Sequence, residues 1–93
     1  MNSTQKKCCR AIADHYGIDS QVLIAIEEMS ELTKELCKHV RKYHRTREIA
    51  EEIADVSIMI EQLISLFGVE SQVSEIIDFK LNRQLDRIEK EGE

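Results

Sequence analysis

Proline is absent from this 93-residue chain, glycine occurs three times, and the only aromatic residues are two Phe and two Tyr. A chain without proline, and with so few glycines, has the composition of helices joined by short turns. Strand patterns of alternating polar and apolar residues are also missing. A chain of this length forms one small domain at most, which we place at residues 1–93. We therefore expect a single all-α domain.

Long apolar runs and a cysteine framework are missing as well. No run approaches the roughly 20 apolar residues of a membrane span, and the segment MNSTQKKCCR lacks the apolar core of a signal peptide. Three cysteines, two of them adjacent, make no disulfide framework, which indicates a reducing compartment. A net charge of −5 argues against general nucleic-acid binding. We expect a cytoplasmic protein with no membrane and no nucleic-acid partner.

Helical periodicity is what the sequence does contain, and it predicts four helices. The first spans about residues 3–16 and ends at Gly17, which suits a C-terminal cap. Asp19 or Ser20 is expected to cap the second helix. These signals place the boundary between the first and second helices at about residues 17–20.

The second and third helices are long enough to form a central antiparallel hairpin, joined by a turn near residues 43–45. Gly68 is expected to end the third helix and Ser71 to cap the fourth. Apolar residues at spacings of three and four mark the face that each long helix turns inward. The predicted inward residues are Val22, Ile26, Met29, Leu32 or Thr33, Leu36 and Val40 on one helix, and Ile49, Ile53, Val56, Ile60, Leu63 and Phe67 on the other.

Paired carboxylates border the apolar face of both long helices. Glu28 and Glu31 lie three residues apart, and Glu52 and Asp55 repeat the spacing on the next helix. In an antiparallel hairpin the two pairs fall at similar height, because one lies about 12–15 residues before the turn and the other about 9–12 residues after it. Four carboxylates brought together repel unless a cation neutralises them. An all-oxygen set without His or Cys suits Mg²⁺, or Mn²⁺, and disfavours zinc.

These acidic segments resemble the signature of the MazG-like, all-α nucleoside triphosphate pyrophosphohydrolases. The resemblance rests on E-x-x-E at 28–31, then 20 residues, then E-x-x-D at 52–55. It extends to EEMSEL and EEIADV as whole segments and to DFKLNRQLDRIEK, where the family often has a Lys followed by an Arg. It covers roughly residues 20–90, and the first helix matches less clearly.

The resemblance implies hydrolysis of an NTP or dNTP to the monophosphate and pyrophosphate, with Mg²⁺ held by the four acids. Glu27 or Glu51 would orient or deprotonate the attacking water. Lys80 and Arg83 would bind phosphate oxygens, although acidic neighbours on their own helix could instead pair with them. Phosphoribosyl-ATP or a modified nucleotide could replace an ordinary NTP, and the physiological role could be the cleansing of nucleotide pools.

Two other classes of protein fit parts of the sequence. A helical interaction module without catalysis could use the acidic faces to bind a basic partner. A carboxylate-bridged di-iron site is disfavoured, because its E-x-x-H motif would need His where Glu31 and Asp55 stand.

The basic segment 38–47 also allows two interpretations. Its cations could simply favour the C-terminus of the second helix, or they could attract a polyanionic ligand.

The third helix predicts self-association. Beside its inward face it carries Ile58, Met59, Ile64 and Leu66, so it is apolar over most of its circumference. Such a helix is normally buried on all sides, and a chain of this size has few helices with which to cover it. We expect a homodimer or homotetramer, and the resemblance implies the same, with sites near subunit interfaces.

Overall fold

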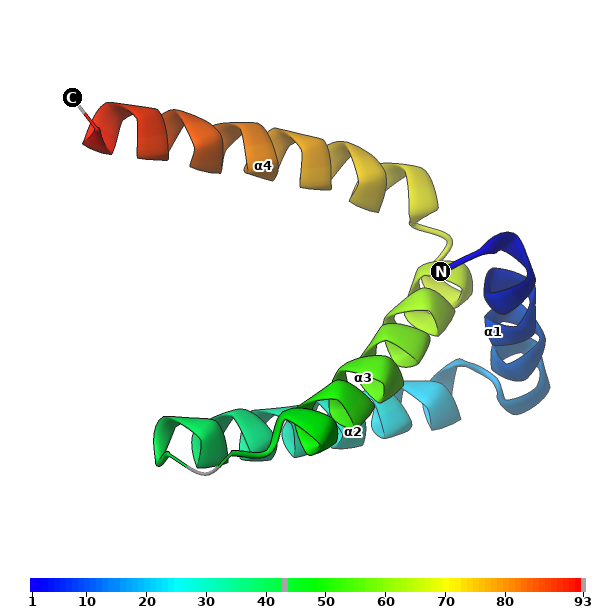
Figure 1. The fold of residues 1–93 in the computed structure, drawn as a ribbon. Coiled ribbons are helices and arrows are strands. Elements are labelled where there is room, and N and C mark those ends of the chain that lie inside the picture. Colours follow the sequence, from blue (N-terminus) through cyan, green and yellow to red (C-terminus); the bar gives the residue numbers. More distant parts are fainter. Residues whose placement is uncertain (43, 93) are drawn as a thin grey trace.

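The computed structural model describes residues 1–42 and 44–92 as four helices (Figure 1). They are α1 (Ser3–Tyr16), α2 (Ile18–Val40), α3 (Thr46–Phe67) and α4 (Glu70–Glu91). The described ranges contain no strand, so the predicted all-α class with four helices is confirmed. No helix in those ranges is long and apolar enough to cross a membrane.

Helix α1 ends as predicted, but α2 begins earlier than predicted. Asn2 caps α1 by accepting a hydrogen bond from the Gln5 backbone N–H at 2.8 Å. Gly17 has a φ of 86°, which favours glycine, and it turns the chain within a single residue. Helix α2 therefore starts at Ile18 without a side-chain cap, and the expectation that Asp19 or Ser20 caps it was wrong.

The junction between α3 and α4 is also formed at a glycine, and the next helix again begins without a side-chain cap. Gly68 ends α3 in the left-handed conformation, as predicted, with a φ of 63° and a ψ of 38°. The Val69 backbone N–H donates to the Ile64 carbonyl at 3.1 Å, which satisfies one of the free carbonyls at the helix end. Helix α4 begins at Glu70 with no side-chain cap, so the expectation that Ser71 caps it was wrong.

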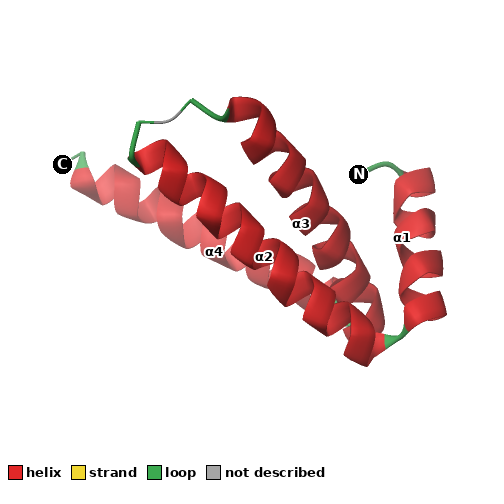
Figure 2. Ribbon diagram, turned by 90° about the horizontal axis from the view of Figure 1, so that it is seen from below, coloured by secondary structure: helices red, strands yellow, loops and turns green. Residues whose placement is uncertain are grey.

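Helices α2 and α3 lie side by side and form the most extensive contact of the fold (Figure 2). Their interface buries Gln21, Ala25 and Glu35 from α2, and Val56, Met59 and Gln62 from α3. The Gln21 amide donates to the Gln62 carbonyl oxygen at 2.8 Å. Helix α1 packs mainly against α3 and buries Cys9 and Ala13. Most of this core consists of small or polar side chains.

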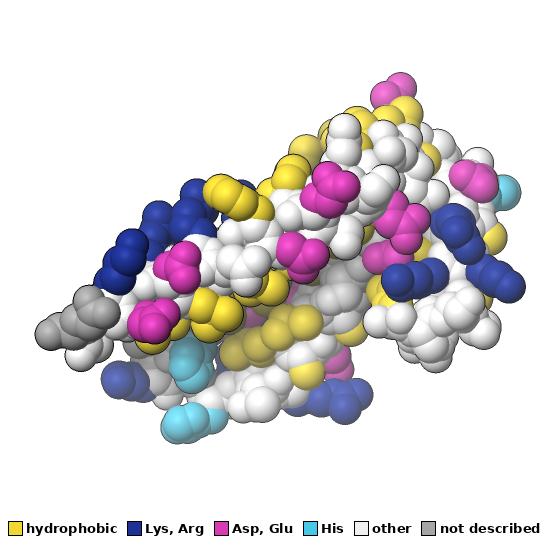
Figure 3. Space-filling view, turned by 90° about the horizontal axis from the view of Figure 1, so that it is seen from above, with side chains coloured by type: hydrophobic (Ala, Val, Ile, Leu, Met, Phe, Trp, Pro, Cys, Tyr) yellow, Lys and Arg dark blue, Asp and Glu magenta, His cyan; other side chains and the backbone are white. Residues whose placement is uncertain are grey.

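The apolar faces predicted to point inward are largely exposed. Ile26, Leu36 and Val40 on α2 are 57%, 46% and 76% exposed, and Ile53, Ile60 and Phe67 on α3 are also exposed. The prediction was wrong for these exposed residues in the single chain, where Gln21, Ala25 and Gln62 are buried instead. It was right for Val56, which is buried. Figure 3 shows hydrophobic side chains at the surface on one side of the molecule. An apolar face of this extent on a folded chain usually marks an interface.

Helix α4 makes the fewest contacts with the rest of the fold. It contacts α3 alone among the other helices and extends away from them (Figure 1). None of its described residues is buried. Its large apolar side chains are 50–65% exposed, and they are Ile76, Ile77, Phe79, Leu81, Leu85 and Ile88. Helices of this kind gain most of their stability from packing an apolar face, and within one chain α4 packs almost none.

Replacing Gln62 by Leu should destabilise the fold, because the buried Gln21 amide would lose its hydrogen-bond partner. An unsatisfied buried polar group costs about 1–3 kcal/mol. In a domain of this size each kcal/mol shifts the melting temperature by roughly 4–8 °C. Changing both glutamines to Leu removes the two polar groups together, so the double variant should melt well above Gln62→Leu. Circular dichroism melts at one fixed protein concentration measure the difference, and equal melting of the two variants would contradict the pairing.

Candidate metal centre

Three carboxylates meet where α2 and α3 lie side by side. One oxygen each from Glu28, Glu52 and Asp55 lies within 4.8 Å of the other two. Glu28 and Glu52 are half-buried and Asp55 is exposed. The structure therefore brings together three of the four predicted ligands, from both helices. We call these three residues the acidic cluster.

Glu31, the fourth predicted ligand, lies at the edge of the acidic cluster and outside it. Its side chain is 48% exposed, and one of its oxygens lies 3.8 Å from the Lys34 ammonium. Its charge still acts on the cluster, because it contributes to raising the pKa of Glu52. Glu31 is thus close enough to influence a bound cation, while its carboxylate points toward a neighbouring lysine.

The cluster is electrostatically unfavourable without a cation. Burial is the main cause that raises the pKa of Glu28 above its ordinary value of 4.5, followed by the charges of Asp55 and Glu52. Burial likewise raises the pKa of Glu52, followed by the charges of Asp55 and Glu31. A raised carboxyl pKa means that the fold disfavours the ionised form. The charged cluster therefore lowers stability at neutral pH, and protonation relieves that cost only as the pH falls toward 4.5.

The oxygens of this site fit a hard divalent cation. Glu52 Oε2 is buried and has no hydrogen-bond partner among the described residues. Buried polar atoms normally have a partner, and one that lacks it needs an explanation such as an ion or water. Two oxygens on opposite sides of Mg²⁺ at ~2.1 Å are about 4.2 Å apart. A small contraction of the cluster would bring its carboxylates within range of one ion.

The two predicted catalytic glutamates flank the cluster in sequence and are both exposed. Glu51 Oε1 accepts a hydrogen bond from Arg47 Nε at 3.1 Å, four residues earlier on α3. Glu27 forms no ion pair within 4.0 Å in the described part of the chain. Both charges contribute to the raised pKa of the adjacent cluster residue, Glu27 for Glu28 and Glu51 for Glu52. Each therefore lies close to the cluster without belonging to it.

Lys80 and Arg83, the predicted phosphate-binding residues, are not brought to the acidic cluster within one chain. Both are exposed on α4, which packs only against α3. The Arg83 guanidinium lies 5.8 Å from the centre of the Phe79 ring on the same helix. Neither residue forms an ion pair within 4.0 Å with a described carboxylate, so acidic neighbours on α4 do not hold them.

A buried ion pair near the end of α2 was not anticipated from the sequence. Glu35 is only 7% exposed, and it accepts hydrogen bonds from Arg45 Nε at 2.7 Å and Lys38 Nζ at 3.3 Å. The Arg45 and Lys38 cations hold the pKa of Glu35 below its ordinary value. The spacing of Glu35 and Lys38 along one helix could have indicated their pairing, but nothing in the sequence indicates the contact with Arg45, which lies beyond the turn.

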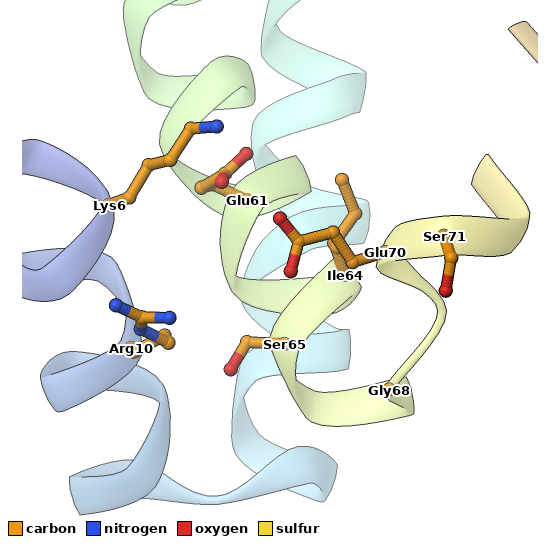
Figure 4. A pocket seen from close by; sticks show the side chains of 8 residues that line it. All are labelled: Lys6, Arg10, Glu61, Ile64, Ser65, Gly68, Glu70 and Ser71. Atoms are coloured by element: carbon orange, nitrogen blue, oxygen red, sulfur yellow. The ribbon is translucent and has the colours of Figure 1, made fainter. Parts of the chain in front are cut away.

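A separate hollow of about 280 Å³ lies between α1, α3 and the start of α4 (Figure 4). Lys6 and Arg10 line it from α1, whereas Glu61 lines it from α3 and Glu70 from α4. None of these four charged residues forms an ion pair within 4.0 Å in the described ranges. The hollow lies at the base of α4. None of the predicted site residues lines it, so it is distinct from the acidic cluster.

Comparison with known proteins identifies no relative. No protein-family model, curated protein or solved structure matches the chain. The residues themselves therefore carry any functional argument.

Glu52→Gln should have opposite effects on stability with and without Mg²⁺. In chelator the variant should melt several degrees higher than the parent, because a neutral amide replaces a carboxylate whose ionised form the fold disfavours. In millimolar Mg²⁺ the parent should gain several degrees, since the ion binds only the folded state, while the variant should gain little. Differential scanning calorimetry measures both shifts. Glu75→Gln on α4, which removes an exposed carboxylate, is the matched control and should behave like the parent.

Equal Mg²⁺ stabilisation of the parent and Glu52→Gln would exclude Glu52 as a ligand. Identical parent melts in Mg²⁺ and in chelator would exclude the metal centre itself.

Proposed function

We propose that this protein is a Mg²⁺-dependent pyrophosphohydrolase that converts a nucleoside triphosphate to the monophosphate and pyrophosphate. The observation that carries this proposal is the acidic cluster with its unpartnered Glu52 Oε2. An all-carboxylate site at the contact of two helices suits a hard cation, and triphosphates are substrates that such cations neutralise. The E-x-x-E and E-x-x-D segments, which resemble those of MazG-like enzymes, support the same activity.

In this proposal Glu28, Glu52 and Asp55 hold the cation, and Glu31 completes the set by turning from Lys34. The bound cation would offset the triphosphate charge, polarise the attacked phosphorus and lower the pKa of a bound water. The half-buried positions of Glu28 and Glu52 limit competing water at the carboxylates. Mn²⁺ would suit the same oxygen ligands.

Glu27 or Glu51 orients the attacking water or takes its proton. Glu51 already accepts a hydrogen bond from Arg47, so one of its carboxylate oxygens is engaged by a neighbour on α3. Glu27 has no comparable cation beside it among the described residues. Glu27 is therefore the stronger of the two candidates for the base.

In the proposed assembly, a second copy of the chain supplies Lys80 and Arg83, which bind the phosphate oxygens of the substrate. Helix α4 exposes both cations and its apolar side chains, and it makes no contact with α2 in its own chain. The proposed assembly is a homodimer or homotetramer in which an antiparallel α2–α3 hairpin bears the cation. In that assembly the exposed apolar faces of α2, α3 and α4 cover one another, and α4 supplies Lys80 and Arg83 across the interface.

An alternative is a helical interaction module without catalysis. The specific observation that favours it is α4, none of whose described residues is buried. In that case the exposed apolar face would bind a partner helix, and the acidic cluster would have no turnover to support. Phosphoribosyl-ATP and modified nucleotides are alternative substrates within the enzymatic proposal.

Turnover tests the proposed function directly. Pyrophosphate release should be measured for a panel of NTPs, dNTPs, modified nucleotides and phosphoribosyl-ATP, with Mg²⁺, Mn²⁺ or chelator. We expect pyrophosphate release with at least one nucleotide, and we expect that release to depend on the cation. Glu52→Gln should lower the turnover rate at least about 100-fold, because it removes a charged ligand of the cation; this corresponds to about 2.7 kcal/mol of barrier. Glu75→Gln should retain parental turnover. Absence of release from the whole panel would favour the interaction module.

Sedimentation velocity at micromolar concentration tests the assembly. We expect a species at two or four times the chain mass of 10.8 kDa, because a monomer would leave the apolar faces of α2, α3 and α4 in water. Replacing Leu81 and Leu85 by Ser should shift the protein toward the monomer and lower turnover together, since the cations of α4 would leave the site. A stable monomer with full activity would refute the shared site.

A further inference from the structure

A cavity of about 460 Å³ lies at the end of the molecule where α2 leads toward α3. It is lined by Lys38, Arg41, His44 and Arg45, and we call it the basic cavity. No described carboxylate lines it, although the chain as a whole has a net charge of −5. A concave surface lined by charges of one sign concentrates ions of the opposite sign.

Two of the four basic side chains are held in place by one buried carboxylate. Glu35 lies behind the cavity and contacts both Arg45 and Lys38, with a second Arg45 hydrogen bond of 3.5 Å from Nη2. One carboxylate neutralises one of these two cations. Because both are tied to the same buried group, they remain at the cavity wall in a fixed arrangement. Such preorganisation lowers the entropic cost of binding an anion.

The other two side chains are not neutralised by a neighbour. Arg41 and His44 form no ion pair within 4.0 Å in the described part of the chain. Besides Glu35, the charge of Glu48 also acts on Arg45. Three permanent cations therefore face two carboxylates, and neither carboxylate lines the cavity. An excess of positive charge with unused donors points to an anionic ligand.

We propose that the basic cavity is a second binding site, which takes a diphosphate group. The planar guanidinium of Arg41 suits phosphate oxygens, whereas Lys38 and the Arg45 donors that Glu35 does not use add further positive charge. The volume of the cavity lies within the range of small-ligand sites and exceeds the needs of a single orthophosphate. A diphosphate offers several charged oxygens and can reach cations on more than one wall.

The site is distinct from the acidic cluster. Lys38 lies ten residues beyond Glu28 on α2, which is about 15 Å along the helix axis, and Glu52 lies seven residues beyond Arg45, which is about 10 Å at ~1.5 Å per residue. The two sites are therefore successive along the helix pair, and the charge of Glu35 reaches Glu52. Binding there needs no divalent cation, because the protein itself supplies the positive charge. The inference consequently does not rest on the proposed hydrolysis.

Isothermal titration calorimetry in chelator, with inorganic pyrophosphate as the probe, tests the site. We expect saturable binding that weakens as salt is added. Arg41→Ala should reduce affinity about tenfold or more, because it removes a charge-assisted contact. Arg47→Ala is the matched control, since Arg47 is exposed at the same end of the molecule, pairs with Glu51 and does not line the cavity. It should reduce affinity by less than about threefold, by screening alone.

Orthophosphate and adenosine diphosphate, at matched ionic strength, identify the ligand further. We expect orthophosphate to bind at least about tenfold more weakly than pyrophosphate, since it offers fewer charged oxygens. Tighter binding of adenosine diphosphate than of pyrophosphate would assign the site to the diphosphate of a nucleotide, and the reverse would assign it to the free anion. Absence of saturable pyrophosphate binding, equal losses in Arg41→Ala and Arg47→Ala, or equal affinity for orthophosphate would each overturn the proposal.

Discussion

Repulsion among carboxylates at the contact of α2 and α3 is the constraint on which the rest of the structure depends. Glu28 and Glu52 are half-buried against each other and Asp55, and burial and charge raise the pKa of both glutamates. At neutral pH the chain must ionise them where the fold disfavours charge. The neighbouring contacts oppose that cost through the Gln21–Gln62 hydrogen bond on one side and the Glu35–Arg45 ion pair on the other. The two helices are therefore held together at both sides of a region that would otherwise push them apart.

This constraint also explains why the apolar side chains face outward. The buried residues of α2 are Gln21, Ala25 and Glu35, and those of α3 are Gln62 and the two apolar residues Val56 and Met59. The large apolar residues then occupy the adjacent face, where Ile26, Leu36 and Ile60 are exposed within one chain. Since burial of apolar area is the main source of stability, a chain built in this way gains much of its stability only when that face is covered.

The sequence predicted helix number and several helix ends, because these depend on local chemistry. Gly68 adopts the left-handed conformation that its position at the end of α3 required. The side-chain caps at Asp19 and Ser71 failed since each following helix begins before them, at Ile18 and Glu70. Helix spacing brought Glu28, Glu52 and Asp55 into one predicted site, but it could not show that Glu31 turns toward Lys34. The sequence could not predict which apolar residues would be buried. Periodicity shows which residues share one face of a helix, but it does not show which other helix covers that face.

The charges of the α2–α3 pair are separated along its length, and a single buried residue lies between the two regions. The acidic cluster occupies the middle of the pair, and the basic cavity occupies the end that carries the turn. Glu35 is acidic, yet it belongs to the basic end, where it ties Lys38 and Arg45 together. Without Glu35 those two cations would repel each other across the turn, and with it they form one wall of a cavity. Arg45 and Lys38 lower the pKa of Glu35 and favour its ionised form, whereas burial, followed by the charges of acidic neighbours, raises the pKa of Glu28 and Glu52. The same residue type is therefore favoured in its ionised form at one position and disfavoured in that form at another, and the burial and the charges around the carboxylate decide which.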